Sequence, residues 1–569
     1  MTKSHSVSRR EFLKIACVGT ARVASNNLLT GLPFVGKVLA QSDSVPDLEV
    51  LLRAVEREVP ILSGNPTRVW SYQGEVIQGN VTSLQSISDS YLGPIFRVRQ
   101  GQHIRIHFEN DLTEKSIVHW HGLILPETMD GHPRYAIAPG ESYTYDFEVI
   151  NRAGTYWYHP HPHGKTATQV YKGLAGLFIV TDDEEAALEL PSDSYDIPLV
   201  FQDRTFDADN QLVYITGGKM TQMMTEMMGF LGDSILVNGK TGFELDVETR
   251  AYRLRLFNGS NFRILKLGWE DGTPLTVIGT DGGLLEAPIE RPYVTLSPAE
   301  RIELWVDFKG RTVGSQLLLK SLPFSGVEMG GTMMGGMEMT ENTTLPQGEE
   351  YPVLKVNVVQ ESTNVLTLPK RLSTIERYKL SDATNANAPR TFEIAMIKEV
   401  WSLNGRTFEM DVAADDEVVQ ANSLEVWEFI NVVNEGKPTG MNMGGMGNAA
   451  TEPMPGMNMN TATPDSMSGM NMGDTNVEPV TGDQMAHPMH IHGVQFQILE
   501  RSVNDAFREG WASLSEGYVD EGWKDTVLLM PGERVKLLMR FGNNPGLYVF
   551  HCHNLEHEDL GLMRNYRVE

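Results

Sequence analysis

The sequence predicts an all-β protein made of three β-sandwich domains, and two observations carry this prediction. Short runs of alternating apolar and polar residues recur along the chain, for example at residues 104–108, 252–256 and 535–539, and Gly, Pro, Asn or Asp soon follows each run. Alternation with a period of two indicates half-buried strands, and many short strands separated by turns are typical of sandwiches. A chain of 569 residues is too long for one ordinary domain and accommodates three sandwiches with insertions.

The first forty residues carry the features of an export signal. A twin-arginine sequence runs from Ser8 to Lys14, and a weakly apolar stretch follows it and ends in a plausible cleavage site at residues 38–40. We therefore expect residues 1–40 to be a twin-arginine signal peptide, and the mature protein to be periplasmic or otherwise exported by this route. A basic disordered tail is the alternative interpretation of these residues.

Two polar stretches, near residues 182–185 and over residues 362–389, divide the rest of the chain. The predicted domains are residues 45–185, 186–361 and 390–569. The third domain is expected to hold an insertion at residues 440–472, where nine methionines lie among Gly, Asn, Pro and Thr. Such a composition cannot bury a core. The middle domain has no histidine cluster, and we expect it to serve as a spacer.

Eleven of the fifteen histidines fall in four short segments of the first and third predicted domains. These segments are residues 119–122, 157–164, 487–493 and 551–558. Imidazole suits copper, zinc, iron and nickel alike, so histidine alone does not select the metal. Four pairs of surface histidines without a metal are the alternative interpretation.

Cysteine usage favours copper. Loss of residues 1–40 would remove Cys17 and leave Cys552 alone, so no intrachain disulfide could form. A lone cysteine in an oxidising compartment is best explained as a metal ligand, and a thiolate with two imidazoles is the ligand set of a blue-copper centre. His551 and His553 flank Cys552, and on a strand they would point to the opposite face from it. One strand can then serve two metal sites, joined by residues about 3.8 Å apart.

With these four motifs in this order, the chain resembles the multicopper oxidases, and among them the bacterial copper-efflux (cuprous) oxidases and bacterial laccases. The resemblance covers almost the whole chain after residue 40. It implies that each domain is a cupredoxin-like Greek-key sandwich and that a trinuclear copper cluster lies between the first and third domains. It also implies four copper ions per chain, namely one of type 1, one of type 2 and a type 3 pair.

The resemblance further implies which residues hold each copper ion. Type 1 copper would be bound by His487, Cys552 and His557, and type 2 copper by His119 and His490. The type 3 pair would be bound by His121, His159, His161, His492, His551 and His553. Asp130 and Glu558 match acids that supply protons to the cluster in this family, while a turn aspartate and a capping glutamate are the alternative interpretations.

Two further positions, His163 and Leu562, lie beside the predicted ligands. Spacing alone would equally allow His161 to act with His163, but the family pattern selects His159 and His161 and leaves His163 a structural role. The family's axial position, ten residues past the cysteine, is Leu562, whereas copper-efflux oxidases carry methionine there. Met563 follows, but strand alternation points it away from the copper. Loss of a thioether should raise the reduction potential, which is a laccase-like feature.

Methionines outside the ligand motifs form further groups. Thioether sulfur is a soft donor that selects Cu(I), so residues 440–472 and 329–339 are expected to bind additional labile Cu(I). The methionines from Met220 to Met228 have the spacing of one helix face, which favours packing in a core or groove.

A docking site for the substrate ion is predicted just before His487. Asp483 and Met485 are spaced by two residues and match the substrate-copper ligands of copper-efflux oxidases. A loop acid and a packed methionine are the alternative interpretation of this pair.

Charge and hydropathy exclude several partners. The chain has a formal charge of −27, and residues 1–40 contribute five net positive charges, which leaves −32 for the remainder. This acidity argues against binding to nucleic acid and to anionic membranes. No later segment has eighteen consecutive apolar residues, so we expect no membrane insertion, and we expect a monomer.

Three functions remain open at this point. The first is a copper-dependent oxidase that couples one-electron oxidation of Cu(I), and of phenolic donors, to the four-electron reduction of dioxygen to water, for copper tolerance. The second is a laccase that acts mainly on phenols or aromatic amines, which Leu562 favours. The third is a non-catalytic copper-binding or scaffold protein, but such relatives lose copper ligands, whereas this chain keeps all of them.

Overall fold

The computed structural model describes residues 44–327, 343–397, 400–432 and 485–569. The predicted signal peptide, both methionine-rich segments and Asp483 lie outside these residues. Within the described ranges, six β-sheets pack in pairs around three hydrophobic cores. The predicted all-β sandwich fold is therefore confirmed.

The first sandwich contains strands β1 to β9. One sheet has the order β2-β1-β5-β7, formed by β1 (Leu48–Val59), β2 (Thr67–Gln78), β5 (His103–Asn110) and β7 (Ser142–Glu148). The other has the order β3-β4-β9-β8-β6, formed by β3 (Leu84–Gln85), β4 (Ile95–Arg99), β9 (Gly176–Thr181), β8 (Gly154–Pro160) and β6 (Val118–His121). Alternate residues of both sheets, such as Ile106, Trp120 and Tyr158, fill the core between them.

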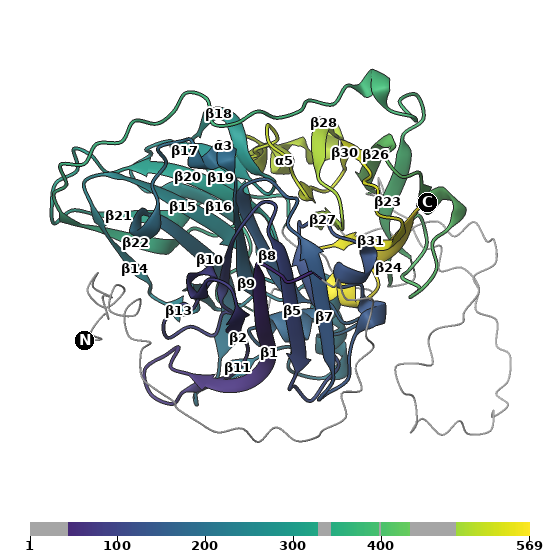
Figure 1. Ribbon diagram of the computed structural model, residues 1–569, viewed down its shortest axis with the longest axis horizontal. Helices are drawn as coiled ribbons and strands as arrows, with labels where there is room; N and C mark the ends of the chain where they lie inside the picture. The colour runs from purple at the N-terminus through teal and green to yellow at the C-terminus, as the bar shows by residue number, and fades with distance from the viewer. Residues whose placement is uncertain (1–43, 328–342, 398–399, 433–484) are drawn as a thin grey trace, which may run out of the picture.

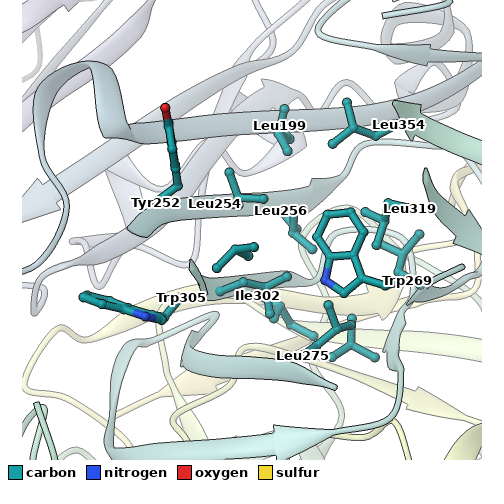
Figure 2. Close-up of a cluster of buried hydrophobic side chains, with 14 of the residues drawn as sticks. Leu199, Tyr252, Leu254, Leu256, Trp269, Leu275, Ile302, Trp305, Leu319 and Leu354 are labelled. Carbon is teal, nitrogen blue, oxygen red and sulfur yellow. The ribbon is translucent and has the colours of Figure 1, made fainter. Parts of the chain in front are cut away.

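The second sandwich has the largest core. Its eight-stranded sheet contains β10 (Asp196–Phe206), β11 (Leu212–Val213), β12 (Ser234–Val237), β13 (Lys240–Thr241), β15 (Ala251–Asn258), β17 (Leu275–Thr280), β18 (Gly283–Arg291) and β20 (Arg301–Asp307). Its second sheet contains β14 (Glu244–Glu248), β16 (Leu265–Trp269), β19 (Val294–Leu296), β21 (Gln316–Ser321) and β22 (Tyr351–Gln360). Figure 2 shows Trp269 among leucines such as Leu256 and Leu275, which are buried between these layers.

The third sandwich contains the remaining strands. One sheet has the order β24-β23-β26-β30-β28, formed by β23 (Arg390–Ile397), β24 (Val400–Leu403), β26 (Leu424–Asn431), β28 (Phe496–Val503) and β30 (Glu533–Arg540). The other has the order β25-β32-β31-β27-β29, formed by β25 (Val418–Val419), β27 (His487–Ile491), β29 (Thr526–Leu529), β31 (Gly546–Cys552) and β32 (Met563–Val568). Two of the four histidine motifs therefore lie on adjacent strands, β27 and β31.

The α-helices of the described chain are short and lie between strands. They are α2 (Thr166–Tyr171), α3 (Asp183–Ala186), α4 (Lys219–Met228), α5 (Arg508–Ser515) and α6 (Leu555–Asp559). The helix that the methionine spacing predicted is α4, and it ends at Gly229, where φ is +99°. A Cβ atom at this glycine would lie 2.5 Å from Phe262 and 2.7 Å from Asn554, so the turn packs too closely for a side chain.

Apolar clusters join the three sandwiches. Trp157 and Leu177 pack with Val200 and Phe257 between the first and second domains. A similar cluster that includes Phe324 joins the second domain to the third. Helix α6 contacts both α2 and α4, so elements of all three domains meet there, and Figure 1 shows yellow C-terminal segments beside blue strands of the first domain. None of the helices described is both long enough and apolar enough to cross a membrane.

Candidate metal centre

Strand pairing brings the four histidine motifs together. Strand β6 pairs with β8 so that His119 lies opposite His159, and β27 pairs with β31 so that His490 lies opposite His551. Facing residues of an antiparallel pair present their side chains on the same side, so each pair of strands offers a face of imidazoles. The two faces meet, because the Nε2 atoms of His119 and His490 are 3.4 Å apart.

Within the described ranges, five groups of buried residues have potential ligand atoms within 4.8 Å of one another. Four of these groups contain all eleven predicted ligands. The groups are His119–His121–His490, His121–His159–His553, His161–His492–His551 and His487–Cys552–His557, and the fifth is His119–Asp130–His492. The structure thus separates a cluster of eight histidines from a smaller site that contains the cysteine.

The orientation of His119 and His490 fits a cation between them. The Nδ1 atom of His119 donates to the carbonyl oxygen of Asp130 at 2.6 Å, and that of His490 donates to the carbonyl of Asp525 at 2.7 Å. A neutral imidazole that donates through Nδ1 carries a lone pair on Nε2. Two lone pairs that face each other at 3.4 Å repel, and a metal ion between them would remove this repulsion.

Unpartnered nitrogens mark one of the other two histidine groups, and closely facing nitrogens mark the second. The Nδ1 atom of His121, the Nε2 atom of His159 and both ring nitrogens of His553 are buried without a hydrogen-bond partner among the described residues. In the neighbouring group, the Nε2 atom of His551 lies 3.1 Å from that of His492 and 3.3 Å from that of His161. Buried polar atoms without partners are costly, so these positions fit ligands of a pair of metal ions.

The histidines of the cluster are held in the neutral form that binds metals. Burial is the main cause that lowers the pKa of His161 to about 4 and the pKa of His490 to about 3. Burial, together with neighbouring histidines, also holds the pKa of His119 well below its ordinary value. At neutral pH, metal ions therefore need to displace little or no proton from these imidazoles.

The two predicted acids lie against the cluster. Asp130 is buried, and its Oδ2 atom accepts a hydrogen bond of 2.7 Å from His492 Nδ1. The Oε2 atom of Glu558 is 3.1 Å from His551 Nδ1, and its Oε1 atom is 3.5 Å from His161 Nε2. Both carboxyl groups thus contact predicted ligands from outside the cluster.

The environments of these two acids shift their pKa values in opposite directions. Burial, assisted by the charge of Glu127, raises the pKa of Asp130 well above its ordinary value. Burial also acts to raise the pKa of Glu558, but His551 and His161 outweigh it and hold this pKa below its ordinary value. In the metal-free protein burial therefore favours the neutral form of Asp130, while the two histidines favour the ionised form of Glu558.

The site with the cysteine is compact and buried. The Sγ atom of Cys552 lies 3.6 Å from His487 Nδ1 and 3.9 Å from His557 Nδ1, and all three residues have 0% exposure. The ring of Trp401 packs against both histidines, with ring centroids 4.6 Å and 4.8 Å apart. Burial raises the pKa of the Cys552 thiol, so a thiolate here requires a nearby cation, and this donor set suits copper.

Met563 points away from Cys552, as strand alternation predicted, and Leu562 lies in the core near it. Met563 pairs with His551, so its side chain lies on the face of β31 that carries His551 and not on the face of Cys552. Leu562 is fully buried in the same core cluster as Cys552, and its carbonyl oxygen accepts the Cys552 backbone N–H at 3.0 Å.

His163 and Met485 lie apart from the ligand groups. His163 is exposed and contacts the ring of Phe408, whereas His159 and His161 both join the cluster. Met485 is 1% exposed and packs in the core of the third domain, where its carbonyl oxygen accepts a hydrogen bond from Asn431.

Two contacts to ligand histidines were not predicted from the sequence, and both involve the middle domain. The Nε2 atom of His557 donates to the carbonyl oxygen of Met227 at 2.8 Å, at the end of α4. The Nε2 atom of His121 lies 3.1 Å from Asp525, whose carboxylate is held by Arg301. The methionine spacing predicted the helix but not its location, and no sequence pattern marked Arg301 or Asp525.

Comparisons with known proteins agree with this geometry. Residues 69–185 and 378–569 match two sequence profiles of multicopper oxidases. The chain is 30% identical over 498 residues to the multicopper oxidase mco of Staphylococcus aureus, covering 87% of this chain and 86% of that protein. It is 27% identical to a laccase of Bacillus subtilis (strain 168), covering 91% of this chain and 92% of the laccase.

A solved structure shows the same similarity. The crystal structure of the McoA multicopper oxidase of the hyperthermophile Aquifex aeolicus matches with a TM-score of 0.69 and 31% identity. The match covers 93% of this chain and 100% of that one.

Proposed function

We propose that this chain, which belongs to the multicopper oxidase family, oxidises Cu(I), and phenolic donors as well, for copper tolerance. Members of the family are copper enzymes that use dioxygen and reduced substrates such as Cu(I) or phenols. Bound copper supplies the one-electron redox chemistry.

The observation that carries the proposal is the position of Cys552 between the two metal sites. Its thiol lies with His487 and His557, while its chain neighbours His551 and His553 lie in the histidine cluster. A short covalent path therefore links a site for electron entry to a site where eight histidines meet. A buffer or scaffold would need neither the path nor two complete ligand sets.

In this proposal each chain binds four copper ions at the four ligand groups. His487, Cys552 and His557 would hold type 1 copper, and His119 and His490 would hold type 2 copper. The groups His121–His159–His553 and His161–His492–His551 would each hold one ion of the type 3 pair. Methionines of residues 329–339 and 440–472 would bind further labile Cu(I).

Asp130 and Glu558 would move protons in this proposal. Each carboxyl group touches a ligand histidine, Asp130 through His492 and Glu558 through His551. Dioxygen reduction to water consumes four protons, and a carboxyl group at hydrogen-bond distance from the cluster edge can hold and release them. We further propose that residues 1–40 direct export by the twin-arginine route and that the protein is a monomer.

The covered type 1 site favours Cu(I) over bulky donors. His487 and His557 have no exposed surface. Trp401 packs on both rings, and the Met227 carbonyl oxygen at the end of α4 accepts a hydrogen bond from His557 Nε2. Met227 and Met228 of α4 pack against the core around Cys552. A large phenol therefore has no direct contact with either ring, whereas a small ion can be held by soft thioethers nearby.

Steady-state oxidation of Cu(I) and of a substituted phenol, measured on the same copper-loaded enzyme, tests the proposal. One variant has all methionines of residues 440–472 replaced by leucine, which keeps length and apolarity and removes only the thioethers. We expect Cu(I) oxidation to fall several-fold and phenol oxidation to be unchanged. Deleting residues 440–472 should reduce Cu(I) oxidation similarly, because it removes the same thioethers, while phenol oxidation should not fall, because none of the predicted copper ligands is lost.

A second pair of variants addresses the predicted docking site. Asp483→Ala should lower Cu(I) oxidation alone, and Asp483→Ala with Met485→Ala should lower it further. Because Met485 is buried, thermal stability and copper content must be measured beside activity. Unchanged Cu(I) oxidation in every variant would reject the Cu(I) route, and a laccase that acts on phenols or aromatic amines, consistent with Leu562, would become the leading assignment.

A further inference from the structure

The middle domain sends one buried arginine into the junction of all three domains. Arg301 is 0% exposed at the start of β20, and all of its N–H groups have acceptors. Its Nε atom donates to the carbonyl oxygen of Thr155, on the first-domain strand β8 that also carries His159. Its Nη1 and Nη2 atoms donate to carbonyl oxygens of Ala299 and Asp281 in its own domain.

The same guanidinium forms a two-pronged ion pair with the third domain. Its Nη1 atom lies 2.8 Å from Asp525 Oδ1, and its Nη2 atom lies 2.5 Å from Asp525 Oδ2. Asp525 is also 0% exposed and directly precedes β29. A buried pair of this geometry is held in position, because opening it would leave two buried charges without a partner.

Asp525 in turn holds two histidines of the cluster. Its Oδ1 atom lies 3.1 Å from His121 Nε2, and its backbone carbonyl accepts from His490 Nδ1 at 2.7 Å. Thr526 supports the arrangement, because its hydroxyl donates to Asp525 Oδ1 at 3.0 Å and lies 3.2 Å from His121 Nε2. A carboxylate that accepts from Nε2 fixes the tautomer of His121 with its lone pair on Nδ1.

That Nδ1 atom is the one which has no hydrogen-bond partner among the described residues and which belongs to the group with His159 and His553. Gly122 shows how closely the pair approaches the motif. Its φ is +85°, and a Cβ atom there would collide with the Asp525 carboxylate and lie 2.9 Å from Arg301 Nη2. The glycine that ends the His-Trp-His-Gly segment therefore makes room for the ion pair.

We propose that Arg301 and Asp525 are positioning residues for the trinuclear copper cluster. The guanidinium of the middle domain holds Asp525, and Asp525 aims His121 and His490, so docking of the middle domain is part of building the metal site. The proposal rests on the assignment of these two histidines as copper ligands and not on the identity of the electron donor. It gives the middle domain a role in copper binding although that domain supplies no ligand.

Copper affinity, measured separately for the two metal sites, tests this proposal. The full chain with Asp525→Asn, and separately with Arg301→Lys, is loaded with copper and titrated with a chelator. Total copper, the blue absorption band and the electron paramagnetic resonance signals are followed. We expect a loss of about 10- to 100-fold in affinity for type 2 and type 3 copper, the usual effect of removing a ligand's partner. The blue type 1 signal should stay, because none of its ligands contacts the pair.

Arg255→Lys is the matched control. Arg255 is also buried in the middle domain, pairs with Asp196 and Glu303, and donates to the Thr155 hydroxyl, but it contacts no histidine of the described residues. We expect this variant to lose thermal stability while it keeps the copper of both sites. The comparison therefore separates a buried ion pair that positions ligands from one that only stabilises the fold.

Three outcomes would overturn the proposal. The first is normal type 2 and type 3 copper in the Asp525 and Arg301 variants. The second is equal loss of the blue signal and the cluster, which would indicate a general folding role. The third is selective cluster loss in Arg255→Lys. If Asp525→Asn fails to fold, Arg301→Lys, which retains the positive charge, together with Thr526→Val carries the same test. The copper measurements on these variants do not depend on whether Cu(I) or a phenol is the donor.

Discussion

The two metal sites differ in how many domains build them. The cysteine site is built entirely from the third sandwich. Its residues lie on the neighbouring strands β27 and β31 and on helix α6, which follows β31, and they are His487, Cys552 and His557. The cluster instead takes four histidines from the first sandwich and four from the third. All the predicted ligands of the first site lie in one domain, whereas those of the second come together only where two domains dock. Packing within one domain therefore brings together the ligands of the cysteine site, and docking between domains brings together those of the cluster.

The middle domain contacts both sites without supplying a ligand. Its helix α4 offers the Met227 carbonyl to His557, and its strand β20 offers Arg301 to Asp525 beside His121. The middle domain is therefore more than the spacer that its lack of histidine clusters predicted. The comparison between the sites can be tested by changes that should affect one and spare the other.

The largest effect is expected from Cys552→Ser. Serine cannot provide the thiolate, so the blue band and the oxidation of every donor should be abolished. The cluster histidines are untouched, because the Cys552 side chain lies on the opposite face of β31 from His551. Absorption spectroscopy and copper analysis should show one copper ion fewer per chain than in the wild type, with the type 3 pair intact. Loss of all copper would show that the two sites are not independent.

Glu558→Gln should act on the cluster and spare the cysteine site. The amide cannot release a proton, so reoxidation of the reduced enzyme by dioxygen should slow by about 100-fold or more. Reduction of the blue site by donors should be unchanged. Stopped-flow measurements of the two half-reactions separate these steps.

A control for Glu558→Gln lies on the same helix. Glu556 accepts hydrogen bonds from Asn261 and Tyr214 of the middle domain and, among the described residues, forms no hydrogen bond or ion pair with a cluster histidine. Glu556→Gln should leave the dioxygen half-reaction at its wild-type rate. Equal slowing in both variants would attribute the effect to α6 packing and not to proton transfer.

Leu562→Met should act on the cysteine site and spare the cluster. The new thioether would lie beside Cys552 and stabilise Cu(II), so the type 1 reduction potential should fall and phenols that are hard to oxidise should react several-fold more slowly. Redox titration of the blue band measures the change. An unchanged potential would mean that residue 562 is not the axial position.

The smallest effect concerns the docking of the first domain on the third. His132 is buried, its Nε2 atom lies 3.0 Å from Asn565 Oδ1 of β32, and its Nδ1 atom accepts from the Arg134 backbone N–H. Burial lowers the pKa of His132 to about 3, so between pH 6.5 and 3 the unfolded chain binds a proton that the folded chain does not. Stability should therefore fall as the pH falls through this range, by about 2 kcal/mol at pH 5.

Denaturant unfolding of the copper-free wild type and of His132→Gln, at pH 7 and at pH 5, measures the contribution of His132 to the pH dependence of the free energy of unfolding. Both proteins share the other buried histidines, so the difference between their pH dependences belongs to His132. The variant should lose about 2 kcal/mol less than the wild type on acidification. Parallel pH dependences would contradict the assignment of a neutral His132 in the folded state.

Local spacing explains why the grouping of the eleven predicted ligand residues was predictable, whereas the residues that hold them in place were not. His119 and His121, or His551 and Cys552, are close in the sequence, and strand alternation fixes which face each occupies. Asp525 follows His121 by 404 residues and Met227 precedes His557 by 330, so these contacts depend on how whole domains pack. The all-β fold was predictable for the same local reason, whereas the burial of Met485 and the location of α4 over His557 depend on tertiary structure.

Because the histidine cluster is divided between two domains, its two halves are synthesised at different times. His161 precedes His551, its neighbour at 3.3 Å, by 390 residues. At a synthesis rate of roughly 5–20 residues per second, the first domain emerges about 20–80 s before its partner strands. During this interval its four histidines are without their partners from the third domain, and imidazole also suits zinc and nickel, although copper(II) generally binds such sites more tightly. Correct loading therefore depends on keeping competing ions scarce, or binding reversible, until the third domain has been made.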